Sequence, residues 1–212
     1  MSIEQAENLR KKLQESLDKL IVKIGKIQIG SKEQFPFGWR KAAKGRTVWR
    51  ILEELITQNL EKYHTEVGIS EITPSDSEVA VHDFHALLIG EKTPVYVNIK
   101  SAVSGGKTQK DDISKGDGLQ AFYEEDINRH FFVATFFIEF HDDMTIEILK
   151  CVVFPIEWIP DVYVNPSNNG NLQSSKYKTI ENAEKRTQSQ FFELFKTALS
   201  EAKKKRQDKS NS

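Results

Sequence analysis

Residues 129–140 have the sequence RHFFVATFFIEF, and this stretch decides the fold. From Phe131 to Ile138 it contains no charged residue, and aromatic and β-branched side chains dominate it. A strand that is wet on one face alternates apolar and polar residues, whereas a continuous apolar run is typical of a strand buried on both faces. The stretch therefore predicts a strand inside a mixed sheet.

The segments on either side show further strand and turn patterns. Residues 141–144 (HDDM) and 90–93 (GEKT) are typical of turns, and the second would join its neighbouring strands as an antiparallel hairpin. Besides the central strand, the predicted strands are residues 67–72, 78–89, 94–101 and 145–154.

Helical periodicity accounts for most of the remaining chain. The predicted helices are residues 2–29, 47–63, 115–128 and 179–205. Residues 102–114 and 159–177 are rich in Gly, Ser, Asn or Pro and are predicted to be loops. This order of elements predicts an α/β fold of the layered α+β kind, with a mixed central β-sheet flanked by helices.

The length of 212 residues suits one domain with small appendages. We expect an N-terminal amphipathic helix over residues 1–30, whose apolar stripe packs on the core or serves dimerisation with a second subunit. A core with surface loops is predicted over residues 31–178. Residues 179–212 are predicted to form a C-terminal helix and a charged tail.

The composition is that of an ordinary soluble globular protein, with 38% hydrophobic and 29% charged residues. No apolar run approaches the roughly 18 residues of a membrane span, and the N-terminus lacks the apolar stretch of a signal peptide. The single cysteine, Cys151, lies in an apolar run and has no partner for an internal disulfide. We therefore expect a cytoplasmic protein without contact to a membrane.

The net charge of −1 argues against a partner held by bulk charge alone, but the basic residues are clustered. Residues 32–50 contain six Lys or Arg and one Glu, a local charge of +5, with four aromatic residues between them. A second group surrounds Gly105-Gly106 and consists of Lys100, Lys107, Lys110 and Lys115. Such clusters suit phosphate contacts, and the alternative is an ordinary solvated surface.

The strongest chemical signal lies in the predicted hairpin. Side chains alternate along a strand, so Asn98 and Lys100 project from one face, while Val97 and Ile99 point into apolar packing. A lysine between such neighbours needs a partner charge, and Asp83 on the other strand can supply it. One interpretation is a structural cross-strand ion pair.

The other interpretation is a site for phosphodiester hydrolysis, which needs a divalent metal, oxygen ligands, an activated water and a cation near the developing charge. Asp83 offers a carboxylate suited to magnesium. The side-chain oxygen of Asn98 or the backbone carbonyl of Ile99 would complete the ligand shell. Lys100 would orient the water or stabilise the transition state.

A further acid is expected from the helix predicted over residues 47–63. Glu53 lies beside the core-facing stripe of this helix, whereas Glu54 has polar neighbours one turn away and is expected to be solvated. Glu53 is therefore the preferred inward carboxylate. Glu71, in the preceding strand, is a weaker candidate.

These residues, in this order, resemble the PD-(D/E)XK nuclease superfamily and, more narrowly, the EcoRV-type restriction endonucleases. The similarity in order and spacing covers roughly residues 47–140. The stretches that carry it are residues 52–55 (LEEL), 82–84 (HDF), 97–101 (VNIKS), 115–122 and the apolar strand from Arg129.

The resemblance implies a restriction-endonuclease-like fold and a homodimer that cleaves double-stranded DNA at a short site with Mg²⁺, for which Mn²⁺ can substitute. Asp83, Asn98, Glu53 and the Ile99 carbonyl would hold the metal, and Lys100 would be the catalytic lysine. Candidate DNA contacts are Arg40, Lys41, Lys44, Arg46, Lys107, Gln109, Lys110, Lys115, Asn168 and Asn169.

Two positions depart from the family pattern. Asn98 stands where the family has Asp or Glu, as a natural variant, an engineered inactivating change or the mark of a lost activity. His82 replaces the usual proline before Asp83. A nuclease-like fold that binds DNA without cutting it is therefore one alternative, and an unrelated α/β interaction protein is another. No glycine-rich phosphate loop, zinc-ligand spacing or Gly-x-Ser-x-Gly elbow occurs, which excludes the functions tied to those motifs.

Overall fold

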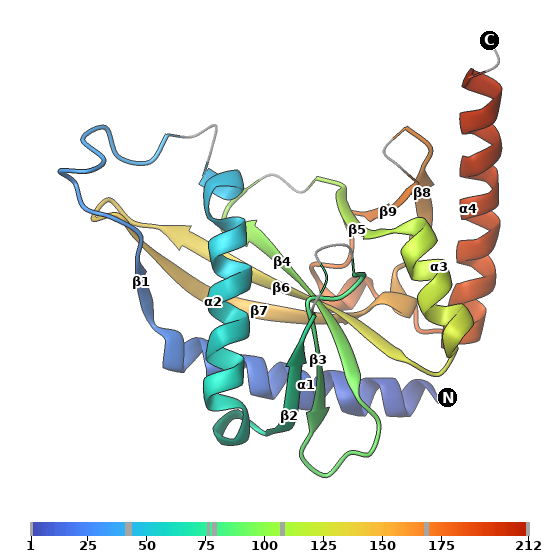
Figure 1. Ribbon diagram of the computed structural model, residues 1–212, viewed down its shortest axis with the longest axis horizontal. Helices are drawn as coiled ribbons and strands as arrows, with labels where there is room; N and C mark the ends of the chain where they lie inside the picture. Colours follow the sequence, from blue (N-terminus) through green and yellow to red (C-terminus); the bar gives the residue numbers. More distant parts are fainter. Residues whose placement is uncertain are drawn as a thin grey trace.

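The computed structural model describes residues 2–40, 44–75, 77, 80–106, 109–167 and 170–210. Within them, four helices pack against a strongly curled six-stranded sheet, and a small three-stranded sheet lies beside it (Figure 1). The predicted mixed α/β class is confirmed. The large sheet has the order β1-β7-β6-β4-β3-β2. Its strands are β1 Lys26–Gln28, β2 Ile69–Pro74, β3 Phe84–Leu88, β4 Val95–Val103, β6 His130–Phe140 and β7 Thr145–Pro155.

The central apolar strand behaves as its composition predicts. β6 runs parallel to β4 and antiparallel to β7, and it is buried from His130 to Phe136. Phe132 and Phe136 belong to a core cluster under one face of the sheet, and Phe131 and Val133 to a second cluster under the other. Because both faces of β6 contribute to a hydrophobic core, neither face favours polar residues, and the sequence of the strand is largely apolar.

Helices cover both faces of the sheet. The first cluster is closed by α1 Ile3–Ile24 and α2 Lys44–Val67, and the second by α3 Gly116–Glu125 and α4 Gln188–Ser210. Four leucines form the apolar stripe of α1, and each is fully buried by this chain alone; they are Leu9, Leu13, Leu17 and Leu20. The stripe therefore packs on the core and offers no surface to a second subunit.

Both N-terminal helices end at a glycine, and neither end lies where the apolar periodicity predicted it. The helix predicted over residues 2–29 stops at Ile24, because Gly25 adopts a φ of +63°, which favours glycine, and residues 26–28 instead pair with β7. The helix predicted over residues 47–63 continues to Val67 and ends before Gly68, whose φ is +101°. Both errors arise because apolar spacing alone does not fix a helix end.

The predicted hairpin exists, but its first strand is shorter than residues 78–89. β3 begins at Phe84 and pairs antiparallel with β4, with Phe84 opposite Val97. Asp83 lies just before it: its N–H donates to the carbonyl of Val97 (2.8 Å), and its carbonyl accepts from the N–H of Ser75 (2.8 Å). The backbone of Asp83 is thus fixed by two neighbouring strands.

Both predicted loops contain strands, so those two predictions were wrong. β5 Asp111–Lys115, β8 Tyr163–Asn165 and β9 Asn171–Ser174 form an antiparallel sheet of order β5-β9-β8. In Figure 1 this small sheet lies between the end of β4 and α4. Strands of three to five residues show too few alternations to stand out among Asn, Ser and Pro.

The last helix begins at Gln188 rather than near residue 179, where only a short 3-10 turn, Ile180–Asn182, forms. Thr187 and Gln190 make a capping box at its start: the Gln190 N–H donates to the Thr187 hydroxyl (3.3 Å), and the Thr187 N–H donates to the Gln190 side chain (2.9 Å). No helix in the described part of the chain is long and apolar enough to cross a membrane. Cys151 is buried, and burial raises its thiol pKa well above the usual value, as expected for a cysteine that packs as a small hydrophobe.

One buried acid lies in the second core cluster. Glu157 is 1% exposed, and neither of its carboxylate oxygens has a hydrogen-bond partner among the described residues. Burial raises the pKa of Glu157 from 4.5 to about 8. Between these two values the folded chain keeps a proton that the unfolded chain has lost, so stability falls as pH rises through this window.

We expect Glu157→Gln to remove this pH dependence. Relative to the parent, the free energy of unfolding of the variant should rise progressively from pH 5 by roughly 4 kcal/mol, at 1.36 kcal/mol per pH unit, and level off above pH 8. Denaturant unfolding at pH 5, 7 and 9 measures the difference. The exposed Glu181→Gln is the control and should show none; a Glu157→Gln difference that is constant with pH would contradict the assignment.

Candidate functional site

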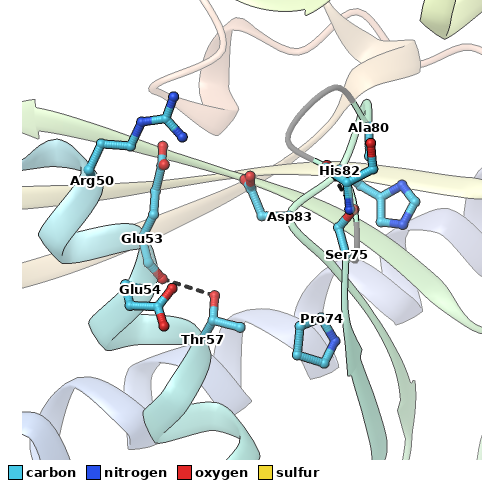
Figure 2. Close-up of a pocket in the computed structure, with 10 residues that line it drawn as sticks. Arg50, Glu53, Glu54, Thr57, Pro74, Ser75, Ala80, His82 and Asp83 are labelled. Carbon is cyan, nitrogen blue, oxygen red and sulfur yellow. Dashed lines mark hydrogen bonds between the residues drawn. The ribbon is translucent and has the colours of Figure 1, made fainter.

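The residues predicted to carry chemistry meet in one cavity of about 250 Å³ at the open end of the β3–β4 hairpin. α2 forms one wall, the segment before β3 and the strand β4 form the floor, and the small sheet forms the opposite wall. A second hollow of about 270 Å³ adjoins it and shares Arg50, Glu53, Ala80 and Asp83 (Figure 2). The residues that line the first cavity are Trp49, Arg50, Glu53, Ala80, Val81, Asp83, Asn98, Lys100, Asp112, Ile113, Ser114, Lys115 and Asn171.

Asp83 is held in place by both its backbone and its side chain. Its carboxylate accepts a hydrogen bond from the backbone N–H of Ile99 (2.5 Å), and this bond fixes the side chain against β4. Burial raises the pKa of Asp83, and the Ile99 N–H and the positive charges of Lys100 and Arg50 oppose that rise. For Asp83 the effect of burial thus outweighs that of its hydrogen bond and its two positive neighbours.

The carbonyl of Ile99 faces the same region. Within a strand, the N–H and C=O of one residue point to the same side, and the Ile99 N–H points to Asp83. The Val97 carbonyl two residues earlier points to the same side, where it accepts from the Asp83 N–H. The Ile99 oxygen therefore lies on the side predicted for a metal ligand.

Glu53 is the helix acid that the fold brings to the site. It is half-buried on α2, and Figure 2 shows it across the pocket from Asp83 with Arg50 beside it. Burial raises the pKa of Glu53 to about 7, the negative charge of Asp83 adds to the rise, and the charges of Lys100 and Arg50 oppose it. Arg50, Glu53, Asp83 and Lys100 all line the same cavity.

The two other acids considered from the sequence are placed differently. Glu54 lines only the second hollow, is exposed, and accepts a hydrogen bond from Gln58 (2.7 Å). Glu71 is exposed on β2 and lines neither hollow. Of the three, Glu53 alone shares the cavity of about 250 Å³ with Asp83 and Lys100.

Lys100 and Asn98 both line the cavity from β4, as their two-residue spacing predicts. The flanking Val97 and Ile99 are buried in the first core cluster, on the opposite face of the strand. The ammonium of Lys100 therefore shares the cavity with the carboxylates of Asp83 and Glu53, and its charge lowers the pKa of each.

The amide of Asn98 connects three segments of the site. Its nitrogen donates to the backbone carbonyls of Val81 and Ile113, both at 3.1 Å. Carbonyls accept and cannot donate, so the nitrogen rather than the oxygen must face them. Asn98 thus joins β4 to the segment that carries Asp83 and to β5, which an aspartate, lacking donors, could not do.

The predicted DNA contacts fall into three groups. Lys115 lines the cavity, and Gln109 lines a wider groove of about 780 Å³ that shares Trp49 with it. The ammonium of Lys110 lies 4.4 Å from the centre of the Tyr163 ring. Arg40 is exposed over the Phe37 ring, away from the cavity. Four further candidates lie outside the described residues: Lys41, Lys107, Asn168 and Asn169. Lys44 and Arg46 belong to α2, but their side chains are outside the described part of the structure.

Two parts of the site escaped the sequence interpretation. Arg50 was interpreted as a basic residue and as a polar neighbour of Glu54, although it also precedes Glu53 by three positions, a spacing that puts side chains on one face of a helix. Asp112 and Asn171 come from strands predicted to be loops. Their presence in the cavity depends on how the small sheet packs, which no local pattern shows.

The donors in the cavity fit a magnesium ion. Mg²⁺ prefers oxygen ligands, keeps several waters and is commonly held by one or two carboxylates. Asp83 and Glu53 supply the carboxylates, Asn98 lines the cavity with them, and burial raises the pKa of both acids, so a bound cation would favour their charged forms. Among the residues that the structure describes, no three His, Cys, Asp or Glu side chains come together. A magnesium ion at this site would therefore need water molecules to complete its coordination.

The chain was compared with protein-family models and with curated proteins, and neither comparison finds a match.

Proposed function

We propose that the protein is a magnesium-dependent nuclease that cleaves double-stranded DNA, a restriction-endonuclease-like homodimer of the cytoplasm. The observation that carries the proposal is the meeting of Glu53, Asp83 and Lys100 in one cavity, although they come from α2, the segment before β3 and β4. Two carboxylates that can hold a divalent metal and a lysine that can stabilise developing negative charge are the protein groups that metal-dependent phosphodiester hydrolysis uses.

Each side chain has a distinct task in this reaction. A bound magnesium ion would neutralise charge on the phosphate and supply an activated water. Asp83 and Glu53 would hold the ion, with Asp83 oriented by the Ile99 N–H. As the water oxygen attacks phosphorus and the bond to the leaving sugar oxygen breaks, the Lys100 ammonium stabilises the charge that develops on the phosphate oxygens.

The direct test is incubation of the purified protein with mixed-sequence duplex DNA in magnesium, in manganese and in chelator. Discrete fragments that form with either metal and are absent with chelator support the proposal, and sequencing of the fragment ends gives the preferred site. Absence of cleavage in every condition contradicts it. Light scattering of the same sample measures the proposed dimer, whose interface must lie away from the buried stripe of α1.

A second candidate is a nuclease-like protein that binds DNA without cutting it. Asn98 favours this alternative, because an amide at this position contributes no charge to a metal. In that case no fragments form, but a gel shift of the same duplex weakens steeply as salt rises, since counterions are released on binding.

The two neighbouring acids of α2 provide a matched pair of variants. We expect Glu53→Gln to lower metal-dependent cleavage by at least roughly 10–100-fold, the cost of losing a group that only supports a metal ligand, because it removes one of the two carboxylates that would hold the ion. Glu54→Gln should change the rate by no more than about twofold, because Glu54 points to Gln58. Initial rates at saturating magnesium measure both. The reverse order would show that the other side of α2 faces the substrate.

A further inference from the structure

The outward face of the small sheet carries a row of polar side chains that crosses all three strands, with the exposed ring of Tyr163 beside them on β8. The inward residues of its strands are buried; they are Ile113, Val164, Leu172 and Ser174. The outward positions hold an exposed Asp112 on β5, a half-buried Gln173 on β9 and a half-buried Asn165 on β8. We call these three residues the amide ladder.

Hydrogen bonds connect the ladder across all three strands. The side-chain nitrogen of Asn165 donates to the side-chain oxygen of Gln173 (3.1 Å), and the side-chain nitrogen of Gln173 donates to the carboxylate of Asp112 (2.6 Å). The N–H of Ser167 donates to the side-chain oxygen of Asn165 (2.9 Å), which fixes the orientation of the first amide. Each amide therefore has a defined direction for its donor and its acceptor.

The ladder is continuous with the candidate site. Asp112 lines the same cavity as Asp83 and Lys100, and so does Asn171, the β9 residue that pairs with Asn165. At the other edge, the Lys110 ammonium lies over the ring of Tyr163, the partner of Gln173 on β8. A substrate held at Asp83 would thus extend directly onto this face.

We propose that the amide ladder contacts base edges in the DNA major groove and determines the cleavage site; this inference rests on the proposed function. Gln173 and Asn165 are the principal residues in this contact. β8 and β9 are neighbouring antiparallel strands at one edge of the small sheet, and an antiparallel pair of strands is an element that the major groove admits. Asn and Gln pair with adenine through its N6 and N7 atoms, and an aspartate accepts from the amino group of cytosine.

The defined directions of the amides suit this task. Discrimination between bases depends on whether a donor or an acceptor meets each base atom, so a reader that rotates freely would accept both patterns. The bonds within the ladder still leave each primary amide with a second hydrogen and its oxygen with a second lone pair.

The test is cleavage of a duplex library with a randomised central block, followed by sequencing of the fragment ends. The parent protein should show a defined preference. Gln173→Ala should reduce that preference by roughly ten- to a hundred-fold at one or two base pairs while sparing the others. Lys110→Ala is the matched control: it should weaken cleavage of all sequences alike and reduce the dependence on salt.

The outcomes separate this inference from the function on which it rests. If the parent cleaves with a preference and Gln173→Ala keeps the same preference, or if the parent cleaves without any preference, the ladder is not the reader and the nuclease proposal stands. If the parent neither cleaves nor shifts the library, the proposed function fails and the ladder assignment fails with it. If thermal unfolding shows that Gln173→Ala is not folded, Asp112→Asn replaces it, because Asp112 is exposed on β5. The measured quantity is again the change in sequence preference at one or two base pairs.

Discussion

We expect the Lys100→Ala variant to lose metal-dependent cleavage by roughly 10²–10³-fold or more, the cost of removing one electrostatic stabiliser of a transition state. The ammonium shares its cavity with Asp83 and Glu53, and no other lysine of β4 can replace it. The fold should be unaffected, because Lys100 lies on the open face of β4 and the core residues Val97 and Ile99 are untouched. Single-turnover rates with saturating enzyme isolate the chemical step.

Lys115→Ala is the matched control for this variant. Lys115 lines the same cavity but is exposed, and it precedes α3 without a side-chain capping bond, so its loss removes only a surface charge. We expect weaker DNA binding and an almost unchanged single-turnover rate. If Lys100→Ala behaved like Lys115→Ala, Lys100 would be a phosphate contact and would have no part in the chemical step.

Residues whose roles follow from periodicity could be placed from the sequence. Alternation along β4 put Asn98 and Lys100 in one cavity, and the apolar stripe of α2 identified the acid of that helix that reaches it, Glu53 rather than Glu54. The continuous apolar run of β6 predicted its burial on both faces. Each inference uses neighbours within one element, where geometry repeats with a fixed period.

The parts that could not be predicted depend on contacts between distant segments. β1 forms because Gly25 ends α1 and leaves residues 26–28 free to pair with β7, more than a hundred residues later. The small sheet assembles from three strands of three to five residues, each too short to show a period. Arg50 was within reach of a helical spacing argument, but Asp112 and Asn171 enter the cavity only through that sheet.

The role of Asn98 is the clearest example, because its partners are backbone oxygens of Val81 and Ile113, whose positions the sequence does not reveal. Comparison with the nuclease pattern alone would make Asn98→Asp a restoring change that adds a carboxylate to the metal site. We expect the opposite: the variant should lose about 1–3 kcal/mol of stability at neutral pH and gain no cleavage. The introduced carboxylate would face two carbonyls as a third acceptor, and both carbonyls would lose their donor.

Denaturant unfolding at pH 7 and at pH 4, together with cleavage assays, measures this effect. At acidic pH the introduced carboxyl is protonated and can donate to one carbonyl again, so the loss of stability should shrink. Asn171→Asp is the control, because it adds the same charge to the same cavity from β9. If Asn98→Asp kept full stability and cleaved faster than the parent, the amide would be dispensable as a connector. The site would then be one carboxylate short of an ordinary nuclease centre.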